Sequence, residues 1–261
     1  MPDGCRLEGH TVALGTMEKL LFWALAPLCL PLFLLWLQGL WVRGRVPRLA
    51  EAMGRRSGSF AGTGKALHLL VVGESPAVGV GLSHISHSMS VQSAAQLAQL
   101  TGRPVHWTVL GYSGAKLADL LHVYAGHIHG GHFDIALLVT GVNDATSNNS
   151  QVRFLSALRA MLALFRSENA ELPVVMAGVP PLKDFPALPE PLASWLGWRA
   201  RCIDEGLAKF AQNDLRLRHI PCGAVEVGEF AADGFHPDAL ASQRWALELG
   251  VACRDLLAGA D

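Results

Sequence analysis

From Ala66 to the end of the chain, short apolar stretches alternate with longer amphipathic ones, and this alternation constrains the fold more than any other feature. The short stretches predict strands and the amphipathic ones predict helices. We expect strands near residues 67–73, 105–111, 133–140, 173–179 and 216–221, and helices near 90–101, 114–125, 150–167, 188–212 and 237–258. Strands that alternate with helices pair in parallel, with helices on both faces. The sequence therefore predicts an α/β sandwich of three layers (α/β/α) around a mostly parallel five-stranded sheet.

The composition is that of a folded protein and argues against some classes of partner. Of the 261 residues, 51% are hydrophobic, which is enough for one sizeable core. The net charge is -1, so no basic field points to nucleic acid. The five cysteines are scattered and lack the spacing of a zinc site or a disulfide framework.

Residues 20–42 form an apolar stretch without a charged side chain. A helix of this length measures about 34 Å and can cross a hydrocarbon core of about 30 Å. We therefore predict one N-terminal transmembrane helix here, after an N-terminal extension at residues 1–19. A cleaved signal peptide is the alternative, but its A-x-A pattern, Ala24 and Ala26, comes before most of the apolar residues rather than after them.

The flanks of this stretch predict the orientation of the domain after it. Five arginines lie in residues 43–65, which are rich in Gly, Arg and Ser and predict a basic linker. The positive-inside rule then places residues 66–261 on the cytoplasmic face, with the periplasmic or extracellular side as the alternative. Met17 is a second candidate start of the chain, which would leave residues 1–16 without a role in the fold.

Ser75 follows the first predicted strand after Gly73 and Glu74. The carboxyl ends of parallel strands carry the functional groups of α/β proteins, and a glycine permits the sharp turn that presents a serine hydroxyl. Ser75 is therefore the candidate nucleophile. A phosphate-binding loop is an alternative for this Gly-rich segment, but it has neither the lysine of a Walker loop nor the spacing of a dinucleotide fingerprint. Taken alone, the segment also reads as an ordinary turn.

Asp233 and His236 stand three residues apart before the last predicted helix. At that spacing the carboxylate can reach the imidazole. Such a pair activates a serine, because the imidazole takes the hydroxyl proton while the carboxylate holds the ring in the right tautomer. For this segment alone, a helix cap by Asp233 beside an exposed His236 is an equally good interpretation.

Two further turns follow predicted strands and offer hydrogen-bond donors. Gly114 lies just after the second strand, and Asn143 just after the third. A backbone N–H at Gly114 and the side-chain amide of Asn143 can each donate to an oxyanion. Taken separately, each of the two segments is an ordinary turn.

As a set, these segments resemble the four sequence blocks of the SGNH hydrolase family, also called GDSL lipases and esterases. The resemblance runs from about Leu67 to the end of the chain and implies the flavodoxin-like fold of that family. It implies that Ser75, Asp233 and His236 form a catalytic triad. The implied oxyanion hole combines the backbone N–H of Ser75 with Gly114 and Asn143.

The chain departs from the family's Gly-Asp-Ser-Leu motif, since it has Gly73-Glu74-Ser75-Pro76. Glutamate keeps the charge on a longer side chain, and Pro76 removes one backbone donor after the nucleophile. Neither change touches a catalytic atom. We expect them to affect rate and substrate rather than the type of reaction.

The segment after the fourth predicted strand is rich in large apolar side chains. Phe185, Leu188 and Trp195 are candidates for a lip that covers an acyl chain, and plain core packing is the alternative. The histidine-rich run at residues 127–132 has no suitably interleaved acidic residue, so we interpret it as a loop rather than a metal site.

Together, these features predict a membrane-anchored, bacterial-type serine hydrolase that cleaves carboxylic esters through an acyl-serine intermediate. The expected substrate is a small acyl ester, with a lipid such as a lysophospholipid, or a thioester, as options. The reaction requires no metal and no organic cofactor. The alternatives are an O-acyltransferase or deacetylase acting on a polysaccharide, and a binding module with an inactive triad.

Overall fold

The computed structural model describes residues 30–147, 149–223, 226 and 228–259. The chain divides into two compact units, residues 1–45 and 46–261. In the first unit, the described residues 30–45 form a helix. Residues 1–29, which hold the predicted extension and the first part of the predicted membrane span, lie outside the described residues. Across the described part of the chain, no helix is long and apolar enough to cross a membrane, so the predicted transmembrane helix is not confirmed.

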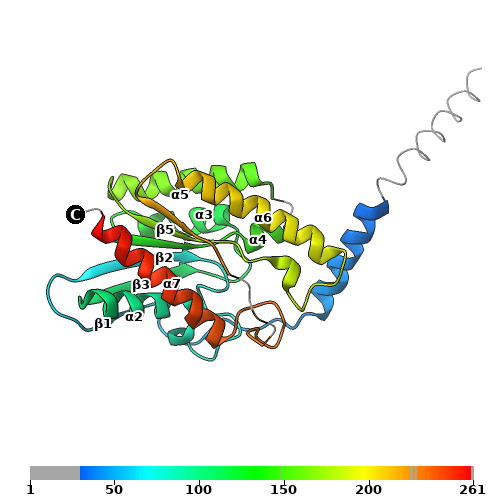
Figure 1. The fold of residues 1–261 in the computed structure, drawn as a ribbon, viewed down its shortest axis with the longest axis horizontal. Coiled ribbons are helices and arrows are strands. Elements are labelled where there is room, and N and C mark those ends of the chain that lie inside the picture. The colour runs from blue at the N-terminus through cyan, green and yellow to red at the C-terminus, as the bar shows by residue number, and fades with distance from the viewer. Residues whose placement is uncertain (1–29, 148, 224–225, 227, 260–261) are drawn as a thin grey trace, which may run out of the picture. The chain divides into compact units, whose positions relative to one another are not determined.

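The second unit is built on a six-stranded sheet with the strand order β1-β3-β2-β4-β5-β6 (Figure 1). Its strands are β1 (Ser57–Phe60), β2 (Leu67–Gly73), β3 (Val105–Gly111), β4 (Ile135–Val139), β5 (Val174–Ala177) and β6 (Leu217–Ile220). The five strands from β2 to β6 pair in parallel, and β1 joins the edge of β3 in the antiparallel sense. The predicted mostly parallel sheet is confirmed.

The predicted number of five strands was wrong, because β1 adds a sixth. Its four residues, SGSF, are mostly exposed and show no apolar alternation. Its pairing with β3, rather than its own side chains, makes this segment a strand. The strand lies within residues 43–65, where the sequence predicted a linker.

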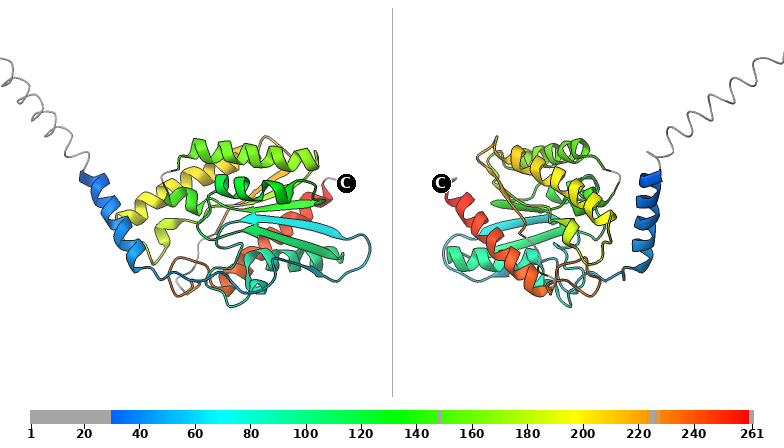
Figure 2. Two further views of the ribbon diagram at one scale, coloured as in Figure 1. Left: turned by 180° about the vertical axis from the view of Figure 1, so that it is seen from behind. Right: turned by 45° about the vertical axis from the view of Figure 1, so that its right-hand side comes forward.

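Helices cover both faces of the sheet (Figures 1 and 2). The helices are α2 (Met89–Thr101), α3 (Leu117–Ile128), α4 (Val142–Thr146), α5 (Gln151–Glu168), α6 (Leu192–Ala211) and α7 (Ala239–Ala258), with short 3-10 turns η1 (Ile85–His87) and η2 (Leu182–Asp184). Helices α2 and α7 pack together on one face, and α3, α5 and α6 lie on the other. The three predicted layers are therefore present.

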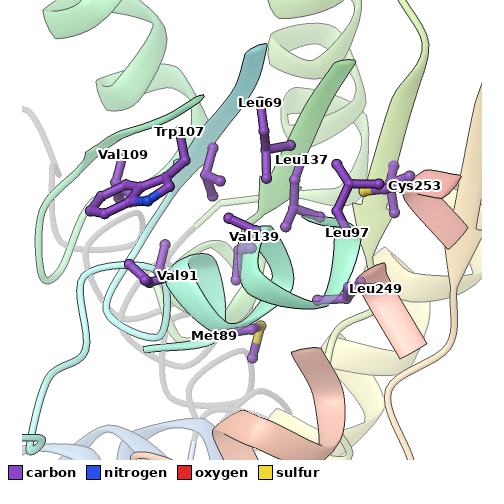
Figure 3. Packing of buried hydrophobic residues seen from close by; sticks show 14 of the residues in the cluster. Leu69, Met89, Val91, Leu97, Trp107, Val109, Leu137, Val139, Leu249 and Cys253 are labelled. Atoms are coloured by element: carbon purple, nitrogen blue, oxygen red, sulfur yellow. The ribbon is translucent and has the colours of Figure 1, made fainter. Parts of the chain in front are cut away.

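The core between the sheet and the α2–α7 face follows from alternation along the strands. Leu69 of β2 and Leu137 of β4 point to this face and pack among Leu97 of α2 and Leu249 of α7 (Figure 3). Burying each such side chain stabilises the fold by about 1.5–3 kcal/mol. The central strands are thereby held firmly, and with them the positions of their carboxyl ends.

The register of the central strands brings three polar segments to one edge of the sheet. Gly73 at the end of β2 pairs with Gly111 of β3 on one side and with Val139 of β4 on the other. The residues that follow these three strands include Ser75, the Gly114 turn and Asn143. Three segments that are far apart in the sequence therefore start side by side at the carboxyl ends of β2, β3 and β4.

Candidate active site

Ser75 lies in the turn that directly follows β2, and it is 5% exposed. The turn is closed by backbone hydrogen bonds, in which Ala77 N–H donates to the Glu74 carbonyl at 2.9 Å and Val80 N–H donates to the Ser75 carbonyl at 3.1 Å. Gly73 makes this sharp turn possible, since a Cβ there would lie 2.5 Å from the Cβ of Ala77. The serine is held in place by β2 and by its own turn.

Asp233 and His236 contact each other as their spacing predicts. The Asp233 Oδ2 lies 2.6 Å from the His236 Nδ1, and the Asp233 Oδ1 accepts the backbone N–H groups of Phe235 and His236, each at 3.0 Å. Gly234 adopts a φ of +63°, which a glycine takes without strain and which closes the turn between the two residues. The turn therefore fixes the carboxylate against one nitrogen of the imidazole.

The hydrogen bonds around Asp233 favour its ionised form. Burial raises the pKa of this carboxyl, but the hydrogen bonds from His236 and Phe235 outweigh burial, so the net pKa lies below its ordinary value. An ionised carboxylate on Nδ1 directs the proton of a neutral imidazole to that nitrogen. Nε2 is then the nitrogen that can accept a proton.

Ser75 and His236 line the same pocket. They lie far apart in the sequence, Ser75 in the turn after β2 and His236 in the loop before α7. The structure thus brings together the predicted nucleophile and the histidine that Asp233 orients.

The two other predicted oxyanion donors lie beside each other at the ends of β3 and β4. The Asn143 side-chain amide donates to the carbonyl of Ala115 at 3.1 Å, next to Gly114. Gly114 is exposed and has a φ of +82°. Neither Gly114 nor Asn143 is found among the described residues that line the pocket of Ser75 and His236.

Glu74, which stands where the family motif has aspartate, holds the first turn of α4. Its Oε1 accepts the N–H of Val142 at 2.8 Å, and its Oε2 accepts the N–H of Asn143 at 2.9 Å. Burial raises the pKa of Glu74 to about 8, against the lowering effect of these two hydrogen bonds. The carboxyl group beside the nucleophile therefore ties Asn143 to the end of β2.

Glu51 supports the Gly114 turn in a way that the sequence did not suggest. Its Oε1 accepts the N–H of Ser113 at 2.6 Å, and its Oε2 lies 2.7 Å from the guanidinium of Arg56. Because Glu51 lies in the predicted linker, outside every recognised motif, no sequence signal pointed to this contact.

Only one of the three predicted lip residues is among the described residues that line the pocket of Ser75. Phe185 is buried and lines the pocket of Ser75. Leu188 is buried and Trp195 is 37% exposed, and neither is among the described residues lining that pocket. Trp195 instead lies against Trp198, with 5.2 Å between the ring centroids.

The histidine-rich run contacts Glu168, which accepts the N–H of Gly130 at 2.7 Å. The Nδ1 of His129 lies 2.5 Å from a carboxylate oxygen of Glu168. In the described ranges, no three or more His, Cys, Asp or Glu side chains are grouped so that they could hold a metal ion.

The profile of the GDSL-like Lipase/Acylhydrolase family matches residues 71–244, well over half of the chain. The chain belongs to this family. The match begins in β2, four residues before Ser75, and continues past the Asp233–His236 turn. The resemblance drawn from the sequence motifs is confirmed, and with it an enzyme of the SGNH/GDSL type.

One relative of the chain is an esterase that is also described as GDSL-like. This GDSL-family chain is 28% identical over 199 residues to the "GDSL-like esterase Rv1075c" of Mycobacterium tuberculosis. The aligned region covers 73% of the chain and 63% of that relative. The chain thus spans less than two thirds of the length of the esterase it matches.

Solved structures share the fold of this GDSL-family chain. The crystal structure of TesA matches with a TM-score of 0.58 at 22% identity, covering 73% of this chain and 99% of that one. An acetyl esterase crystallised with an acetate ion matches with a TM-score of 0.58 at 15% identity, covering 75% of this chain and all of that one. A family two carbohydrate esterase with a carbohydrate-binding domain, from Corynascus, reaches a TM-score of 0.60 at 14% identity and covers 76% and 69%.

Proposed function

We propose that this chain hydrolyses carboxylic esters through an acyl-serine intermediate on Ser75. One observation carries the proposal: the imidazole of His236, held by Asp233 at 2.6 Å, lines the same pocket as the hydroxyl-bearing residue Ser75. The family's description as lipases and acylhydrolases supports the same type of reaction.

In the first step, the Ser75 Oγ attacks the carbonyl carbon of the ester, and His236 Nε2 takes the hydroxyl proton. Asp233 stabilises the imidazolium that forms. The carbonyl oxygen becomes an oxyanion, for which the backbone N–H of Ser75, the backbone N–H of Gly114 and the Asn143 amide are the proposed donors. The C–O bond to the alcohol then breaks, and the alcohol leaves with the proton from His236.

In the second step, water takes the place of the alcohol. His236 removes a proton from this water as the oxygen attacks the acyl-serine carbonyl. The bond between Ser75 Oγ and the carbonyl carbon breaks, the serine regains its proton, and the carboxylic acid departs. The chain ends the cycle in its starting state, so no cofactor is consumed.

The direct test is turnover of a short p-nitrophenyl ester by Ser75→Ala. We expect kcat to fall by at least about 1,000-fold, since loss of the nucleophile in a triad typically costs that much or more. Ser167→Ala is the matched control, because Ser167 is exposed on α5 and remote in sequence from the three triad residues. Undiminished turnover by Ser75→Ala, with an unchanged melting temperature, would refute the proposal.

A further inference from the structure

The pocket that begins at Ser75 and His236 continues between the sheet and α7. Its cavity volume is about 50 Å³, and about 650 Å³ when all the space between the lining residues and the adjoining solvent is counted. One wall consists of the carboxyl ends of three strands, which contribute Val139 of β4, Ala177 of β5 and Ile220 of β6.

The opposite wall is also apolar. Met89 starts α2, and Trp245 and Leu249 lie one turn apart on α7. Met89 and Leu249 are 1% and 3% exposed and belong to the hydrophobic core (Figure 3). The one carboxylate among the described lining residues is Glu248, which is exposed at the surface. Apolar walls bind a hydrocarbon group favourably, and they provide few hydrogen-bond partners for the hydroxyl groups of a sugar.

We propose that this pocket holds the acyl chain of the ester, and that the chain is apolar and longer than acetyl. The inference rests on the proposed function, hydrolysis through an acyl-serine. The acyl group stays bonded to Ser75 between the two steps, whereas the alcohol leaves after the first. A pocket that starts at Ser75 and is walled by core residues therefore suits the group that stays.

This assignment places the acyl site under α7 rather than at the lip that the sequence suggested. Of the three predicted lip residues, Phe185 alone is among the described residues lining the pocket. Ala177 and Ile220 line the pocket from the paired ends of β5 and β6. Their side chains should set the length of the acyl chain that fits, because a larger side chain at either position would leave less room in the pocket. They are specificity-determining positions in this proposal.

Two series of ester substrates, assayed with the full chain, measure the contributions of the acyl group and of the alcohol separately. In the first, p-nitrophenol is fixed and the acyl chain is lengthened from acetyl to decanoyl. In the second, acetate is fixed and the alkyl alcohol is lengthened in the same steps. We expect kcat/KM to rise about fourfold per added CH2 in the first series, until the pocket is full, and to change less than about twofold per CH2 in the second.

Two variants should then shift the preferred acyl-chain length in opposite directions. Ala177→Leu fills the pocket and should lower the hexanoate-to-acetate ratio of kcat/KM by about tenfold or more. Ile220→Ala widens the pocket and should move the optimum to a longer chain. Val152→Ala is the control, since Val152 is 74% exposed on α5. Melting temperatures show whether each variant folds. If Ala177→Leu does not fold, the shift in preferred chain length caused by Ile220→Ala decides the test.

Three outcomes overturn the inference: a flat acyl series, length dependence in the alcohol series, or an optimum moved by Trp195→Ala but by neither pocket variant. Each of these results leaves the proposed function standing, provided that turnover still depends on Ser75. Turnover that persists in Ser75→Ala instead removes the proposed function itself.

Discussion

Three buried carboxyl groups, Glu74, Asp144 and Asp233, lie around the turns of the site, and their surroundings give them different tasks. Asp233 accepts three hydrogen bonds from its own turn and is kept ionised. Glu74 is fully enclosed and has its pKa raised by burial to about 8. Asp144 is also buried, which raises its pKa, and it accepts the N–H of Leu117 at 3.1 Å at the start of α3. The first orients the imidazole, Glu74 joins the turn after β2 to α4, and Asp144 joins α4 to the start of α3.

Asp233→Asn tests the first of these tasks. An amide at this position would favour the wrong tautomer of His236, so we expect kcat on a p-nitrophenyl ester to fall by about 10⁴-fold, with KM changed little. The matched control is Asp238→Asn, because Asp238 caps α7 through the N–H of Ala241 at 2.8 Å and asparagine caps equally well. If Asp233→Asn kept more than about a tenth of the wild-type kcat, the proposed role of Asp233 would be wrong.

Glu74 should make stability depend on pH in a defined window. Its pKa is raised in the folded chain from an ordinary value of 4.5 to about 8, so the folded state binds more protons than the unfolded state between these values. Stability from this group is therefore full below about pH 4.5 and is lost as the pH rises through about 8.

Glu74→Gln removes this titration. Between pH 5 and pH 8, the melting temperature of the wild type should fall further than that of the variant, by at least about 2–4 °C, which corresponds to about 1 kcal/mol in a domain of this size. The variant should be less stable at the lower pH, since its NH2 group faces one of the two N–H donors of α4. Parallel pH profiles for the two proteins would contradict a raised pKa at Glu74.

Among the elements, the closest approach at the site is between the ends of β2 and β3. A Cβ added at Gly111 would lie 2.1 Å from the carbonyl oxygen of Gly73, and side-chain repacking cannot relieve this clash because the contacted atom belongs to the backbone. Glycine at this position therefore permits the register that places the Gly114 turn beside the Ser75 turn.

Gly111→Ala and Gly126→Ala form a matched pair. Gly111→Ala should destabilise the chain by several kcal/mol, on the order of the larger core substitutions, and lower kcat/KM for a short ester at the same time. Gly126 lies on α3 with open space around its Cβ position, so Gly126→Ala should stabilise by about 0.5–1 kcal/mol and leave kcat/KM unchanged. Urea denaturation measures both effects. Equal stability of the two variants would show that the β2–β3 contact does not constrain the site.

The elements that could be predicted from sequence are those whose own side chains mark them. The strands at 67–73 and 105–111 have the predicted bounds, because apolar residues fill them and glycine ends them. One strand and one α-helix were missed, β1 and the five-residue α4. Both are short, and each depends on a partner: β1 on pairing with β3, and α4 on the carboxyl group of Glu74.

The candidate site divides in the same way. The Asp233–His236 contact was predictable because it is local, three residues apart in one turn. The hydrogen bond from Ser113 to Glu51 and the pocket wall formed by Trp245 join segments that no local pattern connects. The lip at residues 180–198 was inferred from apolar content alone, which does not tell a pocket wall from a packed helix.

On the scale of the whole molecule, the segment before β2 is part of the second compact unit. Ala52 N–H donates to the Val78 carbonyl at 3.2 Å, and Ile85 N–H donates to the Met53 carbonyl at 2.8 Å. Glu51, in the same segment, holds the Gly114 turn through Ser113. The folded unit that carries the proposed chemistry therefore begins near residue 46, before the start of the family match at residue 71.

Two fragments test this boundary. Residues 46–261 should fold cooperatively and hydrolyse a short p-nitrophenyl ester with kcat/KM within about threefold of the full chain, because the domain retains its own core and all its site contacts. Residues 66–261 lack β1 and Glu51 and should lose at least about tenfold in kcat/KM or fail to fold. Equal activity of the two fragments would show that the segment before β2 has no role in the site.

The central claim is that Ser75 is a nucleophile activated by His236, and covalent labelling of the full chain by a fluorophosphonate tests it most directly. After labelling and digestion, mass spectrometry should find the phosphonyl group on the peptide that contains Ser75. His236→Ala should slow this labelling by at least about 100-fold, since general-base assistance contributes about 10²–10⁴-fold. An unlabelled Ser75, or a label that forms equally fast without His236, would contradict the account.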